Sequence, residues 1–185
     1  MTYDYVSKLK LAATGKNVLV FIIPAFVVYL FMLFYTIPNV QQYAPEMEIF
    51  DLSPAGYSYE YSMQLLSALG IVGRDAYLYR QLPLDFIYPG LFAISLCLLM
   101  AWVILKGKTH TPAMFYLCLV PIGVGLLDYL ENIQIILMII NYPNISENQV
   151  AMSSVTTIAK SGLTTIVFIF LVIAFIRVAM ARKAG

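Results

Sequence analysis

Four ionisable side chains lie within or at the edge of the long apolar segments of this chain: Asp85, Asp128, Glu131 and Lys160. A charge at the centre of a lone membrane-spanning helix costs about 2.5–3.5 kcal/mol on insertion scales, so these groups must be paired or hydrated. Because three acids face one lysine, one carboxyl is expected to keep its proton unless an arginine balances it. Asp128 and Glu131 are therefore candidate acid–base residues. Lys160 is expected to orient them or to bind an anionic head group.

The polar residues around these charges recur at helical spacing, so that each series shares one helix face. The two series are Pro121, Gly125, Asp128 and Asn132, followed by Ser153, Thr157, Lys160 and Thr164. Small and hydroxylated residues on such a face allow close packing and hydrogen bonds between helices. The candidate ligand-binding residues are Asp85, Tyr88, Asn132, Thr157, Arg74 and Arg80. The two arginines are expected to balance the excess acid or to contact a phosphate.

Other kinds of chemistry have little support in the sequence. His110 is the only histidine and falls in a predicted loop, while Cys97 and Cys118 lie in apolar segments with no C-x-x-C motif. The chain also lacks a phosphate-binding P-loop, a dinucleotide fingerprint and a nucleophile elbow. We therefore expect no metal site and no cofactor.

The composition determines the environment of these residues. The chain has 185 residues, of which 61% are hydrophobic and 11% charged, with a mean hydropathy of +0.82. Soluble domains have about 25% charged residues, so the composition indicates a multi-pass membrane protein with the lipid bilayer as its first partner. The net charge of +1 gives no indication of a nucleic-acid partner, and none is expected.

Four apolar segments are long enough to cross a bilayer as helices, a length of about 20 residues. They cover approximately residues 17–37, 84–105, 112–141 and 147–181. The sequence thus predicts an all-α, integral membrane four-helix bundle that forms a single membrane domain over residues 1–185. The short turn near residues 142–146 makes the third and fourth helices antiparallel neighbours.

The segment between the first two spans, residues 38–83, is too long for a simple turn. Ser53-Pro54 could begin a helix, residues 57–69 read as amphipathic with Gly70 as the end, and residues 73–82 could form a second short helix. Its many tyrosines favour a short helical cap at the outer membrane interface. A solvated loop with some helix is the alternative.

Basic residues indicate the orientation, because Lys and Arg gather on the cytoplasmic side. They precede the first span, occupy the loop between the second and third, and end the chain, the residues being Lys8, Lys10, Lys16, Lys106, Lys108, Arg177, Arg182 and Lys183. Both termini are therefore expected in the cytoplasm. Counted from these ends at about 1.5 Å per residue, the four charged groups lie about 24–31 Å deep, in one layer of the outer leaflet.

Several short strings resemble a pattern in small uncharacterised bacterial four-span membrane proteins. They are Gly56-Tyr57-Ser58, Leu69-Gly70, Gly73-Arg74 with Tyr77, Asp85 with Tyr88-Pro89, and the run from Leu127 to Asn132. The resemblance covers about half of the chain and supplies no activity. It implies a location in the bacterial inner membrane.

An analogy comes from the sterol-isomerase and sigma-2-receptor group, small helical proteins that hold acidic residues in a lipid-accessible cavity. The local likeness is Leu105-Lys106-Gly107 to Thr111-Pro112-Ala113, but the first span here carries no acid. The analogy illustrates one possible kind of site.

The first functional hypothesis is a protein that binds or acts on a lipid-like or isoprenoid-like molecule at the charged cluster, through binding or catalysis. The second is an accessory or structural subunit of a larger membrane complex, with the charges as a packing lock. The third is a proton-coupled carrier. Four spans rarely enclose a path alone, but a homo-oligomer could provide one.

Overall fold

The computed structural model describes residues 2–107 and 111–183, so Lys108 and His110 lie outside the described residues. Every secondary-structure element in these ranges is helical, and the predicted all-α fold is confirmed. Four helical stretches are long and apolar enough to cross a membrane, namely Gly15–Gln41, Tyr59–Lys106, Pro112–Asn141 and Glu147–Met180. The chain is therefore an integral membrane protein with bundle-like helix packing, as predicted.

The chain divides into two compact units that differ sharply in charge. One comprises Met1–Ala25, Gly90–Gly125 and Gly162–Gly185, and the other comprises Phe26–Pro89 and Leu126–Ser161. The first contains eight of the 11 Lys and Arg residues and one of the ten Asp and Glu residues, so we call it the basic unit. The second contains three basic and nine acidic residues and is called the acidic unit.

The basic unit is built from helices at both ends of the sequence and from its middle. Its elements are α1 (Thr2–Ala12), the start of α2 (Gly15–Phe31), α6 (Tyr88–Lys106) from Gly90 onward, η4 (Pro112–Leu119) and parts of α7 (Val120–Asn141) and α8 (Glu147–Lys183). Phe115, Cys118, Met100 and Ala101 are buried in its core. Cys97 is also buried, and both cysteines are free thiols that serve as small apolar core residues.

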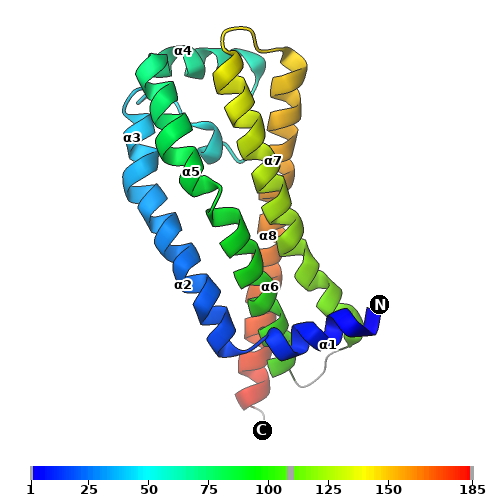
Figure 1. Cartoon of the computed structure of the whole chain (residues 1–185). Helices are drawn as coiled ribbons and strands as arrows, with labels where there is room; N and C mark the ends of the chain where they lie inside the picture. The colour runs from blue at the N-terminus through cyan, green and yellow to red at the C-terminus, as the bar shows by residue number, and fades with distance from the viewer. Residues whose placement is uncertain (1, 108–110, 184–185) are drawn as a thin grey trace. The chain divides into compact units, whose positions relative to one another are not determined.

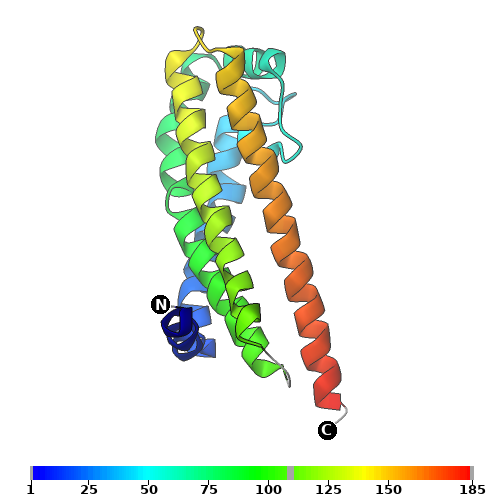
Figure 2. The ribbon, with the colours of Figure 1, turned by 90° about the vertical axis from the view of Figure 1, so that its right-hand side faces the viewer.

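The acidic unit contains the candidate site. It comprises the end of α2, η1 (Met32–Thr36), α3 (Ile37–Gln41), η2 (Phe50–Leu52), α4 (Tyr59–Ala76), η3 (Tyr77–Gln81), α5 (Leu82–Asp85), and the adjoining halves of α7 and α8. Phe50, Tyr77, Leu65, Ile135 and Met138 form its buried core. The second half of α7 and the first half of α8 run side by side on either side of their connecting turn (Figure 2), as predicted.

Two prolines explain two π-helical turns in this unit. Proline lacks an N–H and its ring clashes with the carbonyl four residues earlier, so a helix must widen or bend there. The π-helical turns η1 and η3 stand directly before Pro38 and Pro83, at the start of α3 and α5 respectively. The prediction that the first span ends before Pro38 is therefore wrong, because the helix widens and continues to Gln41.

The segment between the first two spans contains the predicted helix before Gly70 and a second helical stretch after it. Ser58 caps α4 by accepting a hydrogen bond from the Tyr61 N–H, so the expected start at Ser53-Pro54 is wrong. Gly70 interrupts α4 with φ of 60°, where the sequence predicted an end. After this kink the chain turns down through η3 into α5 (Figure 1) and packs against η1 and α3.

The stretch after Gly70 packs one face into the acidic unit and leaves a face of mixed polarity exposed. Tyr77 and Gln81 are fully buried, whereas Ile71 and the charged Asp75 and Arg80 are exposed. Residues 73–82 are helical as predicted, and their location at the outer membrane interface stays a prediction.

Candidate functional site: a buried carboxyl cluster with one lysine

The core of the site is an ion triad between α7 and α8. Lys160 Nζ lies 3.1 Å from Asp128 Oδ1 and also contacts Glu131 Oε2. The Thr157 hydroxyl, one turn before Lys160, donates to Glu131 Oε1. Asp128 is 5% exposed and Glu131 is fully buried, so the structure brings together the three residues that the sequence singled out as candidate acid, base and amine.

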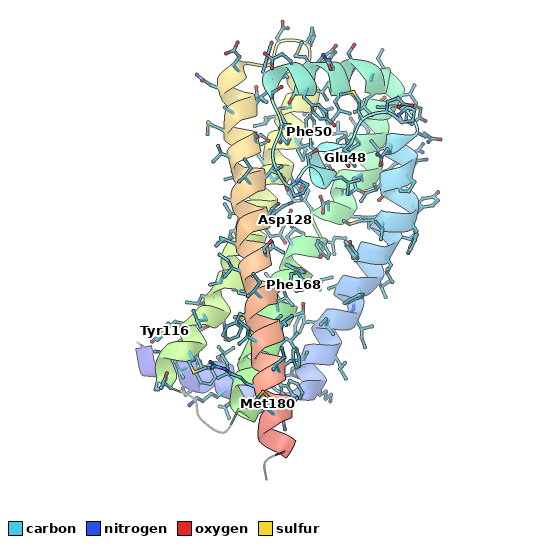
Figure 3. All side chains as sticks on the ribbon, turned by 180° about the vertical axis from the view of Figure 1, so that it is seen from behind. Glu48, Phe50, Tyr116, Asp128, Phe168 and Met180 are labelled. Carbon is cyan, nitrogen blue, oxygen red and sulfur yellow. The ribbon has the colours of Figure 1, made fainter. Side chains whose placement is uncertain are left out.

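A fourth carboxyl comes from a loop residue that the sequence analysis missed. Asp51 lies in η2, between α3 and α4, and its Oδ2 accepts a hydrogen bond from the hydroxyl of the buried Tyr77. Its carboxyl lies within hydrogen-bonding reach of the Asp85 carboxyl. Asp51 Oδ1 is buried, and none of the described residues donates a hydrogen bond to it. Figure 3 labels Phe50, the neighbour of Asp51, and Asp128.

Asp85 and Asn132 interact through the backbone. The second span was predicted to cover about residues 84–105, and within it the helix is interrupted at Phe86–Ile87 and restarts at Tyr88. The reason is Pro89, which cannot donate to the carbonyl of Asp85 four residues earlier. Asn132 Nδ2 donates to that carbonyl instead, at 2.7 Å. Asn132 thus closes a gap in the helix, and its Oδ1 is buried without a partner in the described part of the chain.

Tyr88 lies at the edge of the same cluster. Its ring packs against that of Tyr29 with the centroids 5.7 Å apart, and the side chain is half-buried. The electrostatic neighbours of its hydroxyl include Asp85, Asp128 and Lys160. Tyr88 therefore belongs to the group of residues that the structure brings together.

The two arginines have other partners. Arg74 Nη1 donates to the carbonyl of Leu66 at 2.6 Å, and its guanidinium stacks 4.6 Å from the centre of the Tyr142 ring. Arg80 Nη1 donates to Asn39 Oδ1 at 2.8 Å. Neither contact reaches the cluster, so the four carboxyls have Lys160 as their cationic partner among the contacts of the described residues.

A surface cavity of about 400 Å³ lies beside the cluster in the acidic unit. It is lined by Tyr57, Ser58, Tyr59, Glu60, Glu147, Val150, Ala151, Ser154 and Val155. The Tyr57 hydroxyl lies 2.6 Å from Ser153 Oγ and within hydrogen-bonding reach of Thr157. Burial raises the pKa of this hydroxyl to about 12. Tyr57 therefore stands between the cavity and the Thr157–Glu131 pair.

The loop before Tyr57 is pressed against α8. The Tyr57 N–H donates to Ser154 Oγ at 2.9 Å. Gly56 precedes it with φ of 81°, and a Cβ on Gly56 would lie 2.4 Å from Ser154 Oγ and 2.8 Å from Ile158. Only glycine fits here, because it tolerates both this backbone conformation and the close approach.

The acidic cluster does not have the geometry of a metal site. In residues 2–107 and 111–183, no group of three His, Cys, Asp or Glu side chains is arranged to hold a metal ion. The two carboxylates nearest Lys160 are instead engaged by its ammonium group.

Comparison of the chain with protein-family models, with curated proteins and with solved structures finds no match. The chemistry of the site therefore rests on its own residues.

Proposed function

We propose that this membrane protein binds a lipid-like molecule in the cavity beside Tyr57, with Glu131 and Asp128 as the acid–base pair behind it. The single observation that carries the proposal is a series of hydrogen-bonding groups that runs from Glu131 through Thr157 to Tyr57. Tyr57, at the end of this series, lines the cavity. The cavity of about 400 Å³ is of a size that binds small molecules. Val150, Ala151 and Val155 provide apolar walls for a hydrocarbon chain.

The charges favour a head group that donates hydrogen bonds, such as an amine or a hydroxyl. Glu60 and Glu147 line the cavity, and the lining includes no Lys or Arg. Lys160, which the sequence suggested for an anionic head, is engaged by Asp128 and Glu131. The charged side chains that an anionic head would meet in the cavity are therefore carboxylates, whereas an ammonium or hydroxyl group can donate to them.

The acid–base role follows from the excess of carboxyls over amines. The carboxyls of Asp51 and Asp85 lie within hydrogen-bonding reach of each other, beside the triad of Asp128, Glu131 and Lys160. The Tyr57 hydroxyl is neutral at physiological pH, because the ordinary tyrosine pKa of about 10 is already high and burial raises it to about 12. It can therefore donate and accept at once. A proton can then pass between a ligand and Glu131 along neutral hydroxyls.

The location of the site follows from the distribution of charge. Eight basic residues lie in the basic unit and nine acidic ones in the acidic unit, the distribution expected if the basic unit faces the cytoplasm. We place both termini in the cytoplasm and the cluster toward the outer leaflet. The resemblance to small bacterial proteins favours the inner membrane.

The test uses three ligands of equal chain length and different heads: dodecylamine, dodecanol and dodecanoic acid. Each is added to the detergent-solubilised protein, and the thermal midpoint is measured. The amine or the alcohol should raise the midpoint and the acid should not, because a ligand that binds only the folded state stabilises it by mass action. Equal effects of all three ligands would refute the proposal.

A cavity-filling variant provides the matched control. Ala151→Phe should abolish the shift, since Ala151 lines the cavity. Met152→Phe changes the next residue of the same helix, which is 65% exposed and does not line the cavity. It should leave the shift intact. A shift that survives Ala151→Phe would show that the amine binds elsewhere.

A second candidate function is a packing lock in an accessory subunit. The observation that favours it is that the ammonium of Lys160 is engaged by both α7 carboxylates. Such a buried ion network can fix the register of two helices without any ligand. In that case Ala151→Phe would change nothing, and the purified protein would retain one larger membrane partner.

A further inference from the structure

A groove in the basic unit combines apolar walls with one lysine. Its volume is about 160 Å³, and its lining residues are Trp102, Val103 and Lys106 from α6 and Phe175, Val178 and Ala179 from α8. The Lys106 ammonium lies 5.7 Å from the centre of the Trp102 ring. The groove lies wholly within the basic unit and shares no residue with the acidic cluster.

The charges of this unit leave Lys106 without an acidic side chain to pair with there. Asp4 is the only Asp or Glu in the sequence of the basic unit. Its carboxylate is already 2.8 Å from Lys8 Nζ. Eight Lys and Arg residues therefore share a single carboxylate, and an anion is the complementary ligand for this groove.

The indole of Trp102 holds the lysine at the edge of the apolar surface. The start of α2 packs against this ring, since a Cβ on Gly15 would lie 3.7 Å from Trp102 Nε1. Tryptophan is typical of the level at which lipid head groups meet acyl chains. A lysine at that level can contact a phosphate while its carbon stem and the groove walls contact a chain.

We infer that the groove between α6 and α8 binds one anionic phospholipid, with its phosphate on Lys106 and an acyl chain along Phe175 and Val178. The charge excess of the basic unit excludes a cationic ligand, and the apolar walls favour a lipid over a free ion. This site is independent of the cavity beside Tyr57. It would anchor the basic unit to a leaflet rich in acidic lipids.

The single tryptophan of the chain makes the inference directly measurable, because all tryptophan fluorescence comes from Trp102. The protein is reconstituted in phosphatidylcholine vesicles that contain a small fixed fraction of lipid with brominated acyl chains. The brominated lipid is either phosphatidylglycerol or phosphatidylcholine, and bromine quenches the indole only on close approach. One basic residue near the surface favours an anionic lipid by about fivefold, so phosphatidylglycerol should quench Trp102 markedly more at equal mole fraction.

Variants separate this site from general surface charge. Lys106→Gln should make the two brominated lipids equally effective, and Lys106→Arg should preserve the preference. Lys10→Gln is the matched control, since Lys10 also lies over an aromatic ring, at 4.9 Å from the centre of Phe115, in the same unit. It removes the same charge and should leave the preference intact.

Three results would overturn the inference. One is equal quenching by the two brominated lipids in the unmodified protein. Another is a loss of preference in Lys10→Gln as large as that in Lys106→Gln, which would assign the effect to overall charge. The third is abolition of the preference by inorganic phosphate at constant ionic strength, which would identify the ligand as the free ion.

Discussion

The ammonium group of Lys160 on α8 lies 3.1 Å from the carboxylate of Asp128 on α7, and this ion pair joins the two helices within the acidic unit. Glu131 contacts the same ammonium one turn along α7. The consequence for stability depends on how the pair is removed. Taking away one partner leaves a buried charge alone, whereas replacing all partners by neutral groups removes the desolvation cost as well.

Lys160→Met should therefore destabilise the protein by about 3–5 kcal/mol. The triple variant with Asp128→Asn and Glu131→Gln added should recover most of this loss, since no uncompensated charge remains. The unfolding free energies of the single and the triple variant are measured by titration with a denaturing detergent. The exposed pair Lys8–Asp4 is the control, and Lys8→Met should cost less than about 1 kcal/mol. A triple variant as unstable as the single one would contradict this account.

Asp51→Asn should stabilise the folded protein at neutral pH. The change removes one of the carboxyls that crowd Asp85 and keeps an oxygen to accept from Tyr77. Like charges about 4 Å apart at a partly buried site repel by up to about 4 kcal/mol, so an increase of about 1–4 kcal/mol is expected. The thermal midpoint is compared with that of Glu48→Gln, an exposed acid in the same loop. A lower midpoint for Asp51→Asn than for the control would show that Asp51 is needed as an anion.

Asn132→Leu should cost about 1–3 kcal/mol, because the Asp85 carbonyl then loses the hydrogen bond that Asn132 Nδ2 donates to it. The cost should shrink in a background that carries Pro89→Ala. Alanine restores an N–H that can bond to the same carbonyl and continue the helix. A double-mutant cycle of unfolding free energies tests the coupling. Additive effects would mean that Pro89 and Asn132 act independently.

Stability should fall as the pH rises from about 10 to about 12. The ordinary tyrosine pKa is about 10, and burial raises that of Tyr57 to about 12. The folded protein therefore binds more protons than the unfolded chain in this range, and the unfolding free energy drops by about 1–3 kcal/mol. Tyr57→Phe should remove part of this dependence, whereas Tyr79→Phe, which removes an exposed hydroxyl, should leave it unchanged. Thermal melts at stepped alkaline pH measure it, and identical slopes for the two variants would refute the assignment to Tyr57.

The periodicity of apolar and polar residues was sufficient to predict the long helices and part of the candidate site. Asp128 and Asn132 recur at helical spacing, as do Ser153 and Thr157 on the facing helix, and all four are buried. Because a helix has a fixed period and rise, side chains on two antiparallel neighbours can be matched from their distance to the connecting turn. The bounds 112–141 and the start of the fourth helix at residue 147 also agree with the prediction, which came from the lengths of the apolar segments.

The residues outside that periodicity could not be predicted. Asp51 lies in a single 3₁₀ turn, and loop geometry does not repeat, so nothing in the spacing pointed toward Asp85. A proline can either interrupt a helix or be accommodated within it. Whether a helix stops, as at Phe86–Ile87, or widens, as before Pro38, depends on which neighbour accepts or supplies the missing hydrogen bond. Those neighbours come from distant parts of the chain.

Gly56 has a consequence for recognising relatives of this protein. Its missing side chain is what lets the loop backbone reach Ser154 and hold Tyr57 at the cavity. A side chain at position 56 and a bulky one at position 154 are each incompatible with that approach. Chains that share the site should therefore pair a glycine at the first position with a small hydroxyl residue at the second, and this coupled signature can be sought in sequences too divergent for ordinary alignment.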